Sequence, residues 1–369
     1  MKIIISGHNG FVGKHFIRNL KKNDIKTPIE KLTRSDFLDL KKLIKKISPN
    51  DIVVHLAAIN RDVDDKSLIK KNNDINNQLC KALKSINFKG KLIFSSSTQE
   101  SQKTVYGKIK QQARIKFKEQ SKLLGYKFHG LIIPNLFGPF CQPNYNSFVA
   151  TFSNQILEGI EPKVNEDNTI NLLYIDDLIN MIIDLISSKT EDIKFHNVSR
   201  IKVGEVLQKL KNYYKIYINK GDFPALESNF EIQLFNTFRS YINYNEFFPK
   251  KYKSFHDNRG TFFELNRTLS ESQSSFSITN KGQIRGQHYH SRKIERFSVV
   301  KGKAKLIIRE ILSRNKIEYI LDGENPSYVD IPIWYTHSLE NIGKDELITF
   351  FCISEHFSDA NHDTYPEIV

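Results

Sequence analysis

The first part of the chain alternates short apolar runs with longer amphipathic segments. Stretches of strand length lie at residues 2–6, 28–32, 51–58 and 92–94, most of them largely apolar, and segments with helical spacing lie between them. Continuous apolar runs are typical of strands that are buried on both faces. Strands that alternate with helices predict an α/β fold with a doubly wound parallel sheet.

The pattern changes after residue 256. Short runs rich in β-branched and aromatic residues follow one another there and are separated by turn residues. These runs are residues 297–300, 304–309, 317–320 and 347–353. Such spacing predicts a second, all-β region that folds as a barrel or jelly roll.

The stretch between these two regions sets the predicted domain boundary. Residues 203–243 have helical spacing and can complete a substrate lobe, whereas residues 244–253 contain Pro249 and several lysines and show no period. A chain of 369 residues is also long for one hydrophobic core. We therefore predict one domain over residues 1–245 and a second over residues 252–369.

Composition and charge narrow the class of protein. The sequence contains no apolar run of the ~18 residues that a membrane helix requires, so no membrane partner is expected. Three widely spaced cysteines predict no disulfide framework and favour a reducing, cytoplasmic location. The net charge of +14 comes from scattered lysines, so we expect no nucleic-acid partner. The same charge suits the attraction of an anionic nucleotide substrate.

A glycine triplet stands between the first apolar run and the helical segment after it. Glycines at these spacings allow a tight turn, a close approach of the backbone to a pyrophosphate and close packing of the helix on the strand. A lone triplet is weak evidence, but this one has the strand before it and the helix after it that a Rossmann dinucleotide site requires. The predicted cofactor-binding residues are Gly7, Gly10, Phe11, Val12, Gly13, Leu56 and Ala57.

A basic residue follows the second predicted strand, residues 28–32. Arg34 stands where an acidic residue would hold a ribose 2′-hydroxyl, and an arginine there suits a 2′-phosphate. Arg34 therefore favours NADPH over NADH as the cofactor. The alternative is a loop arginine in solvent.

A serine, a tyrosine and a lysine follow the run at residues 92–94. Tyr106 and Lys110 are one helical turn apart on one face, and Ser97 comes directly after the strand. An ammonium group lowers the pKa of a phenol, which can then give a proton to a carbonyl oxygen as hydride arrives at its carbon. Most Tyr-x-x-x-Lys pairs are solvated helix faces, so this interpretation depends on the nicotinamide site that precedes it. We predict these three residues as the catalytic set.

Together these motifs resemble the extended short-chain dehydrogenase/reductases, a family that acts largely on nucleotide sugars. The residues that carry the resemblance are the glycine triplet, His55-Leu-Ala-Ala58, Ser97, Tyr106-x-x-x-Lys110 and Pro134-Asn-Leu-Phe-Gly-Pro139. The resemblance implies that Ser97 holds the substrate carbonyl and that Tyr106 is the general acid. It also implies that Lys110 binds the nicotinamide ribose and that Asn135 lines the substrate side. The sequence departs from the family in two ways. The interval between Ser97 and Tyr106 is shorter than in most members, and Ile132 stands where many members have an arginine.

Histidines and a carboxylate recur at fixed spacing in the β-rich region. His288 and His290 alternate along a strand and so face the same side. Glu295 returns from the next strand, and His337 comes from a later hairpin. Three imidazoles and one carboxylate suit Zn²⁺, Fe²⁺, Mn²⁺ or Ni²⁺, and we expect a divalent metal with Zn²⁺ as the first choice.

The full spacing of this motif resembles the cupin family. One departure is Trp334, the single tryptophan of the chain, which stands where the second cupin motif usually has glycine. We expect this side chain to narrow the cavity without removing a metal ligand.

A second resemblance overlaps the metal motif. Residues 257–264 and 282–289 resemble the nucleotide-sugar 3,5-epimerases of deoxyhexose pathways, in which the histidine after Arg-Gly is a metal-free general base. Here that histidine is His288, so two roles stay open for it. We favour the role of metal ligand, because Glu295 and His337 have no other shared purpose.

A reductase joined to a cupin with this epimerase character resembles the bifunctional enzymes of capsular polysaccharide synthesis. The resemblance implies a UDP-2-acetamido-2,6-dideoxy-4-hexulose as substrate. Its C3 would be epimerised in the cupin region, and its C4 ketone would then be reduced with NADPH to UDP-N-acetyl-6-deoxy-L-talosamine, on the route to UDP-N-acetyl-L-fucosamine. Arg259 and Arg285 are candidates for contacts to the substrate diphosphate, with ordinary surface arginines as the alternative.

Three other interpretations stay open. The protein could be a simple NADPH-dependent 4-ketoreductase in which the cupin is a structural, dimerising module. The cupin could instead be an iron-dependent oxygenase, or the chain could be a basic, nucleotide-binding regulator without enzymatic activity. Cupins and reductases of this kind commonly form dimers, so we expect a homodimer.

Overall fold

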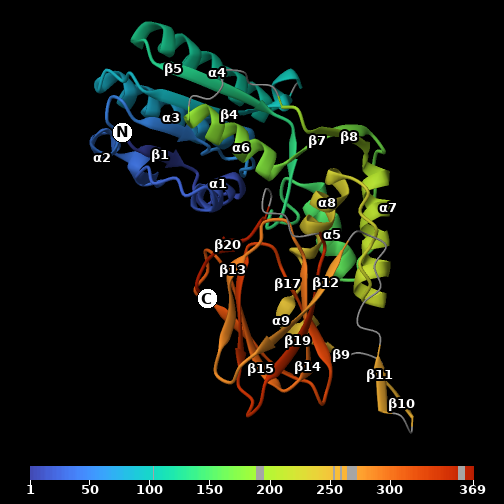
Figure 1. Ribbon diagram of the computed structural model, residues 1–369. Helices are drawn as coiled ribbons and strands as arrows, with labels where there is room; N and C mark the ends of the chain where they lie inside the picture. Colours follow the sequence, from blue (N-terminus) through green and yellow to red (C-terminus); the bar gives the residue numbers. More distant parts are fainter. Residues whose placement is uncertain (103, 188–194, 252–253, 258–259, 264–271, 356–361) are drawn as a thin grey trace. The chain divides into compact units, whose positions relative to one another are not determined.

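The computed structural model describes residues 1–102, 104–187, 195–251, 254–257, 260–263, 272–355 and 362–369 (Figure 1). The chain forms two compact units. The first consists of Met1–Phe137 and Thr169–Ile201, and the second of Gly138–Asn168 and Lys202–Val369. Among the described helices, none combines the length and the apolar character that a bilayer span requires.

A five-stranded parallel sheet forms the centre of the first unit. Its order is β2-β1-β3-β4-β5, and every neighbouring pair is parallel. The strands are β1 (Ile3–Ser6), β2 (Ile29–Leu32), β3 (Ile52–His55), β4 (Lys91–Ser97) and β5 (Lys127–Ile133). The order changes direction between β1 and β3, where doubly wound sheets bind their ligands at the carboxyl ends of the strands. This sheet confirms the predicted α/β fold.

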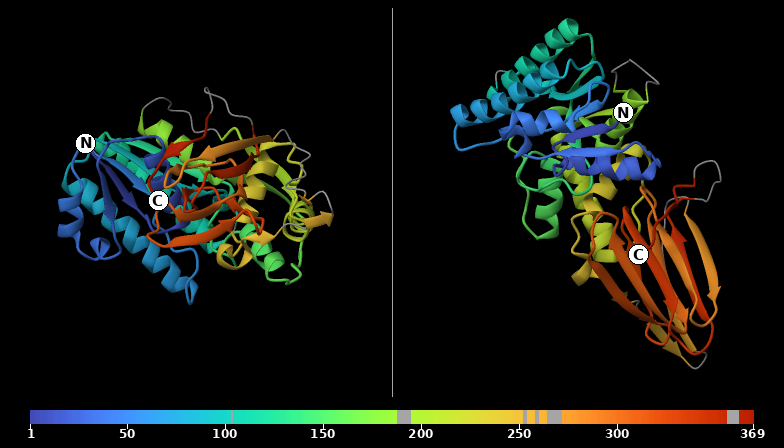
Figure 2. Two further views of the ribbon diagram at one scale, coloured as in Figure 1. Left: turned by 60° about the horizontal axis from the view of Figure 1, so that its bottom comes forward. Right: turned by 90° about the vertical axis from the view of Figure 1, so that its left-hand side faces the viewer.

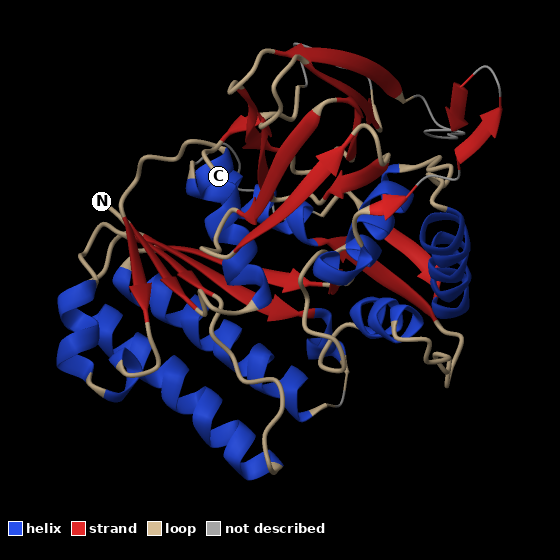
Figure 3. Cartoon of the chain, turned by 90° about the horizontal axis from the view of Figure 1, so that it is seen from below, coloured by secondary structure: helices blue, strands red, loops and turns tan. Residues whose placement is uncertain are grey.

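Helices cover both faces of this sheet (Figure 3). They are α1 (Phe11–Lys22), α2 (Leu40–Lys46), α3 (Asp65–Ser85), α4 (Val105–Leu124) and α6 (Ile175–Ile186), with the short turns η1 (Asp36–Leu38) and η2 (Thr98–Ser101). Apolar side chains of α2, α3 and α4, including Leu43, Leu79 and Phe117, form one core with Ile4 and Val53 of the sheet. Because side chains alternate along a strand, Ile3 and Ile5 point to the other face.

A small sheet of order β6-β7-β8 follows the parallel sheet. Its strands are β6 (Asn135–Phe137), β7 (Thr169–Tyr174) and β8 (Val198–Lys202). The helical elements of the second unit are α5 (Phe148–Leu157), α7 (Val203–Tyr213), η3 (Tyr214–Lys220), α8 (Asn229–Arg239) and α9 (Tyr244–Phe247). The helical spacing predicted for residues 203–243 is confirmed by α7, η3 and α8.

The remaining strands confirm the predicted all-β region. Two five-stranded sheets have the orders β12-β19-β14-β17-β9 and β16-β15-β18-β13-β20, and β10 pairs with β11 in antiparallel fashion. Figure 2 shows the strands of this region in orange and red. The strands are β9 (Lys250–Lys251), β10 (Ser254–Asp257), β11 (Gly260–Phe263), β12 (Gln273–Thr279), β13 (Ile284–Tyr289), β14 (Glu295–Lys301), β15 (Lys303–Glu310), β16 (Lys316–Asp322), β17 (Ser327–Ile331), β18 (Tyr335–Asn341), β19 (Leu347–Ile353) and β20 (Tyr365–Pro366).

A buried ion pair joins the helices of the second unit to its β-sheets. The Arg296 guanidinium of β14 donates to Asp330 of β17 through Nε and Nη2, at 2.8 and 3.1 Å. The hydroxyl of Tyr217, from η3, donates to the same carboxylate. The helical segment and the β-region therefore form one compact unit. The predicted division into residues 1–245 and 252–369 stays a prediction, because contacts do not say which segments fold independently.

Candidate active and metal sites

The glycine loop lies between the carboxyl ends of β1 and β3. Gly7 has a positive φ of +74°, and a Cβ on it would lie 2.8 Å from the nitrogen of Ala57 and 2.9 Å from the carbonyl carbon of Leu56. A Cβ on Gly13 would lie 2.3 Å from the oxygen of Gly7. Any side chain at these two positions would therefore displace backbone, so the close packing that the sequence predicted requires glycine.

The first turn of α1 is suited to bind an anion. Gly10 precedes the helix and provides no side-chain cap, whereas most neighbouring helices begin with one. Phe11 and Val12 are half-buried at this amino end. Backbone N–H groups without a side-chain acceptor, at the positive end of the helix dipole, are what a pyrophosphate binds. The loop thus fits the dinucleotide that the sequence predicted.

Arg34 lies in an exposed turn directly after β2. The carboxylate of this turn, Asp36, accepts hydrogen bonds from the nitrogen and hydroxyl of Thr33, at 2.7 and 2.8 Å, and from Lys46 at 3.1 Å. Burial alone would raise the pKa of Asp36, but these bonds lower it below its usual value. These hydrogen bonds hold the Asp36 side chain within the turn, whereas the Arg34 side chain is exposed.

Lys110 is buried beneath Tyr106 at the start of α4. Its Nζ donates to the carbonyl oxygen of Ser95 at 2.6 Å and lies 5.8 Å from the centroid of the Tyr106 ring. Burial lowers the pKa of Lys110 to about 7, although the charge of Glu100 opposes this shift. Ser97 ends β4, half-buried, and its hydroxyl accepts from the nitrogen of Gln99 at 3.2 Å. The predicted serine, tyrosine and lysine thus occupy the end of β4 and the start of α4.

The short interval between Ser97 and Tyr106 is held by an ion pair that the sequence analysis missed. Glu100, in η2, accepts from Arg114 Nε at 2.8 Å and from Arg114 Nη2 at 2.6 Å, and also from the hydroxyl of Ser96. Burial would raise the pKa of Glu100, but these bonds lower it. Glu100 therefore fixes η2 against α4, and nothing in the spacing of Glu100 and Arg114 marks them as a pair.

The other predicted substrate-binding residues differ in exposure and in their hydrogen bonds. Asn135 begins β6 and is exposed, and Ile132, on β5, is 41% exposed. Arg285, on β13, donates to Thr279 Oγ1 and to the carbonyl oxygen of Ile278, both at 2.9 Å, so its guanidinium is held against β12. Arg259 lies outside the described residues.

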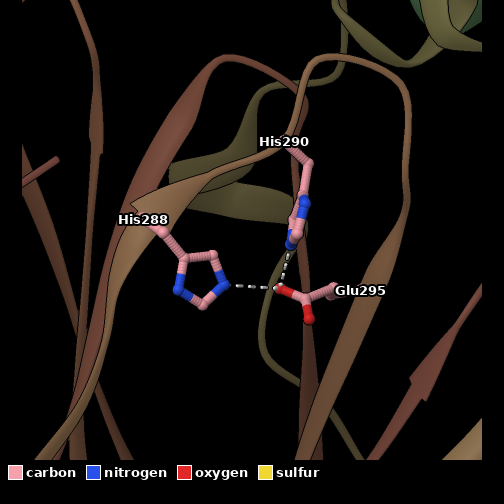
Figure 4. Close-up of side chains that lie close together, drawn as sticks. All are labelled: His288, His290 and Glu295. Carbon is pink, nitrogen blue, oxygen red and sulfur yellow. Dashed lines mark ion pairs between the residues drawn. The ribbon is translucent and has the colours of Figure 1, made fainter. Parts of the chain in front are cut away.

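Three imidazoles converge on one carboxylate oxygen in the β-region. The Nε2 atoms of His288, His290 and His337 lie 4.0, 3.0 and 3.6 Å from Glu295 Oε2. Figure 4 shows His288 and His290, from β13 and the turn after it, pointing at Glu295 of β14. The possible ligand atoms of His288, His290 and Glu295 all lie within 4.8 Å of one another. His337 is not part of this closest group. His337 lies in β18, where it pairs with His288 across the strands.

The hydrogen bonds around the imidazoles orient their Nε2 atoms toward this centre. His288 Nδ1 bonds to the carbonyl oxygen of Gly286 at 3.0 Å, and His290 Nδ1 bonds to that of Asp363. Backbone carbonyls accept, so each Nδ1 carries a proton and Nε2 is the ring atom that faces Glu295 and could bind a metal. Both ring nitrogens of His337 are fully buried and have no hydrogen-bond partner within the described part of the chain. Buried imidazoles of this kind fit a metal ion.

The charge states also fit a cation. Burial would raise the pKa of Glu295, but the neighbouring histidines, His290 foremost, lower it to about 2, so the carboxylate is ionised. Burial lowers the pKa of His337 to about 3, so this imidazole is neutral. A carboxylate beside a neutral imidazole is the state that binds a divalent metal. His288, His290, Glu295 and His337 would hold such an ion.

Asp363 organises the turn after His290. Its buried carboxylate accepts from the nitrogen and hydroxyl of Ser291, at 3.2 and 2.6 Å, and from the nitrogens of Arg292 and Lys293, at 3.0 and 3.1 Å. Because its carbonyl oxygen also bonds His290, Asp363 acts through its backbone as well as its side chain. The sequence analysis did not assign it a role.

Trp334 packs away from the histidines. Its φ is +63°, the left-handed backbone that glycine usually takes, and its ring stacks on Tyr289 with centroids 5.8 Å apart. Tyr289 alternates with His288 and His290 and so faces the other side of β13. The expected narrowing of the cavity is therefore wrong. The tryptophan fills an apolar cluster with Tyr289 and Ile333 instead.

The doubly wound sheet with its glycine loop defines a dinucleotide-binding enzyme class. Residues 3–199 match the model of the NAD dependent epimerase/dehydratase family, and the chain belongs to this family. Residues 255–365 match the polysaccharide biosynthesis C-terminal domain.

Similar proteins extend this result to the whole chain. The capsular polysaccharide assembling protein CapF from Staphylococcus aureus has a crystal structure that is 30% identical, covers 100% of both chains and superposes with a TM-score of 0.63. A structure of CapF with the inhibitor 3-isopropenyl-tropolone is 28% identical over 100% of both chains, with a TM-score of 0.57. A Pseudomonas aeruginosa protein, UDP-2-acetamido-2,6-beta-L-arabino-hexul-4-ose reductase, is 29% identical over 99% of this chain and 98% of its own. These matches confirm the resemblance to capsular polysaccharide enzymes.

Proposed function

We propose that the protein is an NADPH-dependent nucleotide-sugar 4-ketoreductase with 3-epimerase activity, acting in capsule or O-antigen synthesis. The observation that carries the reductase is the buried Lys110 amine beneath Tyr106, at the sheet edge that also carries the glycine loop. Full-length similarity to a UDP-hexulose reductase and to CapF supports the substrate class. The substrate is a UDP-2-acetamido-2,6-dideoxy-4-hexulose, and the partner subunit of the proposed homodimer is a second copy of this chain in the cytoplasm.

The reduction needs a proton at the C4 oxygen. The dinucleotide supplies the hydride to C4 when it is bound at the glycine loop. Tyr106 gives its phenol proton to the C4 oxygen, and Ser97 donates a hydrogen bond that holds the carbonyl. Lys110 lies under the phenol ring, where its positive charge stabilises the tyrosinate that remains and its amine can bond the ribose. Asn135, exposed beside this edge, orients the sugar.

Arg34 supports the choice of NADPH. A guanidinium binds a 2′-phosphate through charge-assisted hydrogen bonds. The carboxylate of the same turn, Asp36, is buried and bonds Thr33 and Lys46 through Oδ2, whereas the Arg34 side chain is exposed. The turn therefore favours the phosphorylated cofactor.

The histidine cluster supports the epimerase. A ketone at C4 acidifies the hydrogen on C3, so a base can remove it and the enolate can be protonated on the other face. A divalent metal, with Zn²⁺ as the first choice, would supply Lewis-acid stabilisation of the C4 oxyanion when bound by His288, His290, Glu295 and His337. The backbone carbonyls of Gly286 and Asp363 hold two of these imidazoles in the ligating tautomer. Epimerisation comes first, and reduction then gives UDP-N-acetyl-6-deoxy-L-talosamine, the precursor of UDP-N-acetyl-L-fucosamine.

A simple ketoreductase with a structural, dimerising β-region is the second candidate. The buried contacts of Arg296 and Asp330 with Tyr217 favour it, because they make the β-region part of the helical lobe.

The Tyr106→Phe variant tests the division of labour. This variant keeps the ring over Lys110 and removes the proton donor, so we expect NADPH oxidation to fall by about 10²-fold or more while C3 hydrogen exchange is unchanged. The two readouts are followed on the same UDP-4-keto sugar, by absorbance and by NMR. Equal loss of both activities would contradict two separate centres.

A further inference from the structure

Two buried guanidinium groups in the second unit lie near a single carboxylate. Arg239 and Arg296 are 2% and 3% exposed. Asp330 binds Arg296 through both oxygens and also accepts the hydroxyl of Tyr217. Both oxygens of Asp330 therefore already accept hydrogen bonds from Arg296 or Tyr217. A second buried cation therefore needs another source of negative charge, because an unpaired buried charge is costly.

Arg239 has no carboxylate bonded to it in the described part of the chain. Its Nε donates to the Tyr217 hydroxyl at 3.3 Å, and its guanidinium lies 5.2 Å from the centroid of the Tyr217 ring. Its Nη2 is buried and has no hydrogen-bond partner among the described residues. A buried charged donor without a partner is rare in native structures and requires an explanation.

Arg239 lines a cavity of about 40 Å³. The cavity lies between α8, α9 and the turn that leads into β18, with Asn236, Tyr244 and Ile333 also in its lining. The Tyr244 hydroxyl and Asn236 Oδ1 are buried and lack partners within the described ranges as well. Asn236 Nδ2 donates to the carbonyl oxygen of Arg292 at 3.1 Å, which fixes the amide with Oδ1 as the unsatisfied atom.

We propose that this cavity binds a small monovalent anion of the size of chloride, held by Arg239 Nη2 and the Tyr244 hydroxyl, beside one water that donates to Asn236 Oδ1. The three unsatisfied groups are two donors and one acceptor. An anion accepts from both donors, and only a donor such as water satisfies the amide oxygen.

The volume of the cavity and the positive charge of Arg239 favour a small anion as the ligand. A water molecule needs roughly 10–15 Å³ by the same measure, so the cavity has room for an ion and a water but not for a sugar or a nucleotide. Water alone would satisfy the hydrogen bonds but would leave the Arg239 charge unpaired. Part of the lining is apolar, such as Phe140 and Ile333, and a less polar surrounding strengthens the attraction between the guanidinium and the anion.

The anion would connect α8 to α9, which provide its two donors, in a cavity that Ile333 also lines. Asn236 and Arg239 belong to α8, whereas Ile333 precedes β18, the strand that carries His337. A ligand that binds only the folded state raises its stability according to concentration and affinity. Halide ions should therefore stabilise the protein in a saturable way.

Thermal unfolding of the full-length protein tests this site. The unfolding temperature is measured in sodium bromide, sodium chloride and sodium gluconate at equal ionic strength, since gluconate is too large for the cavity. We expect a saturating rise of a few degrees with either halide over gluconate. Crystals grown in bromide should show an anomalous scattering peak in contact with Arg239 Nη2 and the Tyr244 hydroxyl.

Two matched variants make the test specific. Tyr244→Phe removes one donor and keeps the ring, so the halide-dependent rise should shrink. Tyr213→Phe removes another buried hydroxyl of the same unit, which bonds the carbonyl oxygen of Glu231 at 3.3 Å, and should leave the rise unchanged. Equal unfolding temperatures in bromide and gluconate, or bromide crystals whose cavity holds only water, would overturn the proposal.

Discussion

At the scale of single residues, Lys110 is the buried amine on which the proposed reductase site depends. It is 4% exposed, and burial lowers its pKa to about 7 from the usual 10.5. Between these two values the unfolded chain binds a proton that the folded protein lacks. The free energy of unfolding therefore rises as the pH increases from about 7 toward 10.5, and this gain is absent below the folded pKa.

Lys110→Met should remove this pH dependence. Below pH 7 the variant should be more stable relative to the native protein, because the native protein must bury a charged amine there. The difference should shrink as the pH rises to 9.5. Urea unfolding at a series of pH values measures it, with Lys108→Met, an exposed lysine of the same helix, as the control. Parallel pH profiles for the Lys110 variant and the native protein would contradict a depressed lysine pKa.

Arg34→Ala should reduce the preference for NADPH. Loss of a charge-assisted contact to a phosphate costs about 1.5–3 kcal/mol, so the KM for NADPH should rise roughly 10–100-fold while that for NADH stays nearly constant. Steady-state kinetics with both cofactors measure the ratio. An equal change for both cofactors would place Arg34 away from the 2′-phosphate.

At the scale of elements, the pairing of β13 with β18 builds the histidine cluster. The register shifts between Gly286 and His288, and Gln287 takes a positive φ of 60° at this bulge. A Cβ on Gly286, whose φ is +97°, would lie 2.6 Å from the carbonyl oxygen of His337. The close approach of these two strands therefore depends on a glycine.

Gly286→Ala should lower the metal content of the purified protein as well as its stability, because the added methyl group pushes β18 and His337 away. Gly282→Ala is the matched control. Gly282 also has a positive φ, +72°, but no atom lies within 4 Å of its added Cβ, so only backbone strain of about 1 kcal/mol is expected. Elemental analysis and thermal unfolding of both variants give the comparison. Full metal content in Gly286→Ala would show that the approach of the strands is not needed.

The sequence predicted the strands of this cluster but not its support. Alternation along a strand placed His288 and His290 on one face, and the geometry around Glu295 agrees. The role of Asp363 was not predicted because this residue is 73 positions from His290 and bonds the imidazole through a backbone carbonyl, which has no signal in a sequence. The prediction for Trp334 was wrong because a large side chain at a position that usually has glycine was expected to fill the cavity. The left-handed backbone at Trp334 instead directs its ring toward Tyr289.

At the scale of the whole molecule, the α/β and all-β halves were predictable from the period of their apolar residues. The composition of the two compact units was not. The second unit combines helices and strands through Arg296, Asp330 and Tyr217, whose partners are 34 and 113 residues apart. A buried ion pair over such separations leaves no periodic pattern, so the sequence did not indicate these contacts. The predicted domain boundary itself stays a prediction.

Deuterium incorporation is the most direct test of the two-centre account. The protein is incubated with the UDP-4-keto sugar in D₂O without NADPH, and C3 is followed by NMR. The account predicts deuterium at C3 before any reduction, loss of this exchange when a chelator removes the metal, and continued NADPH oxidation by the chelated protein if it is given the epimerised ketone. Absence of exchange, with NADPH still consumed when it is added, would contradict an epimerising β-region and leave a ketoreductase with a structural partner.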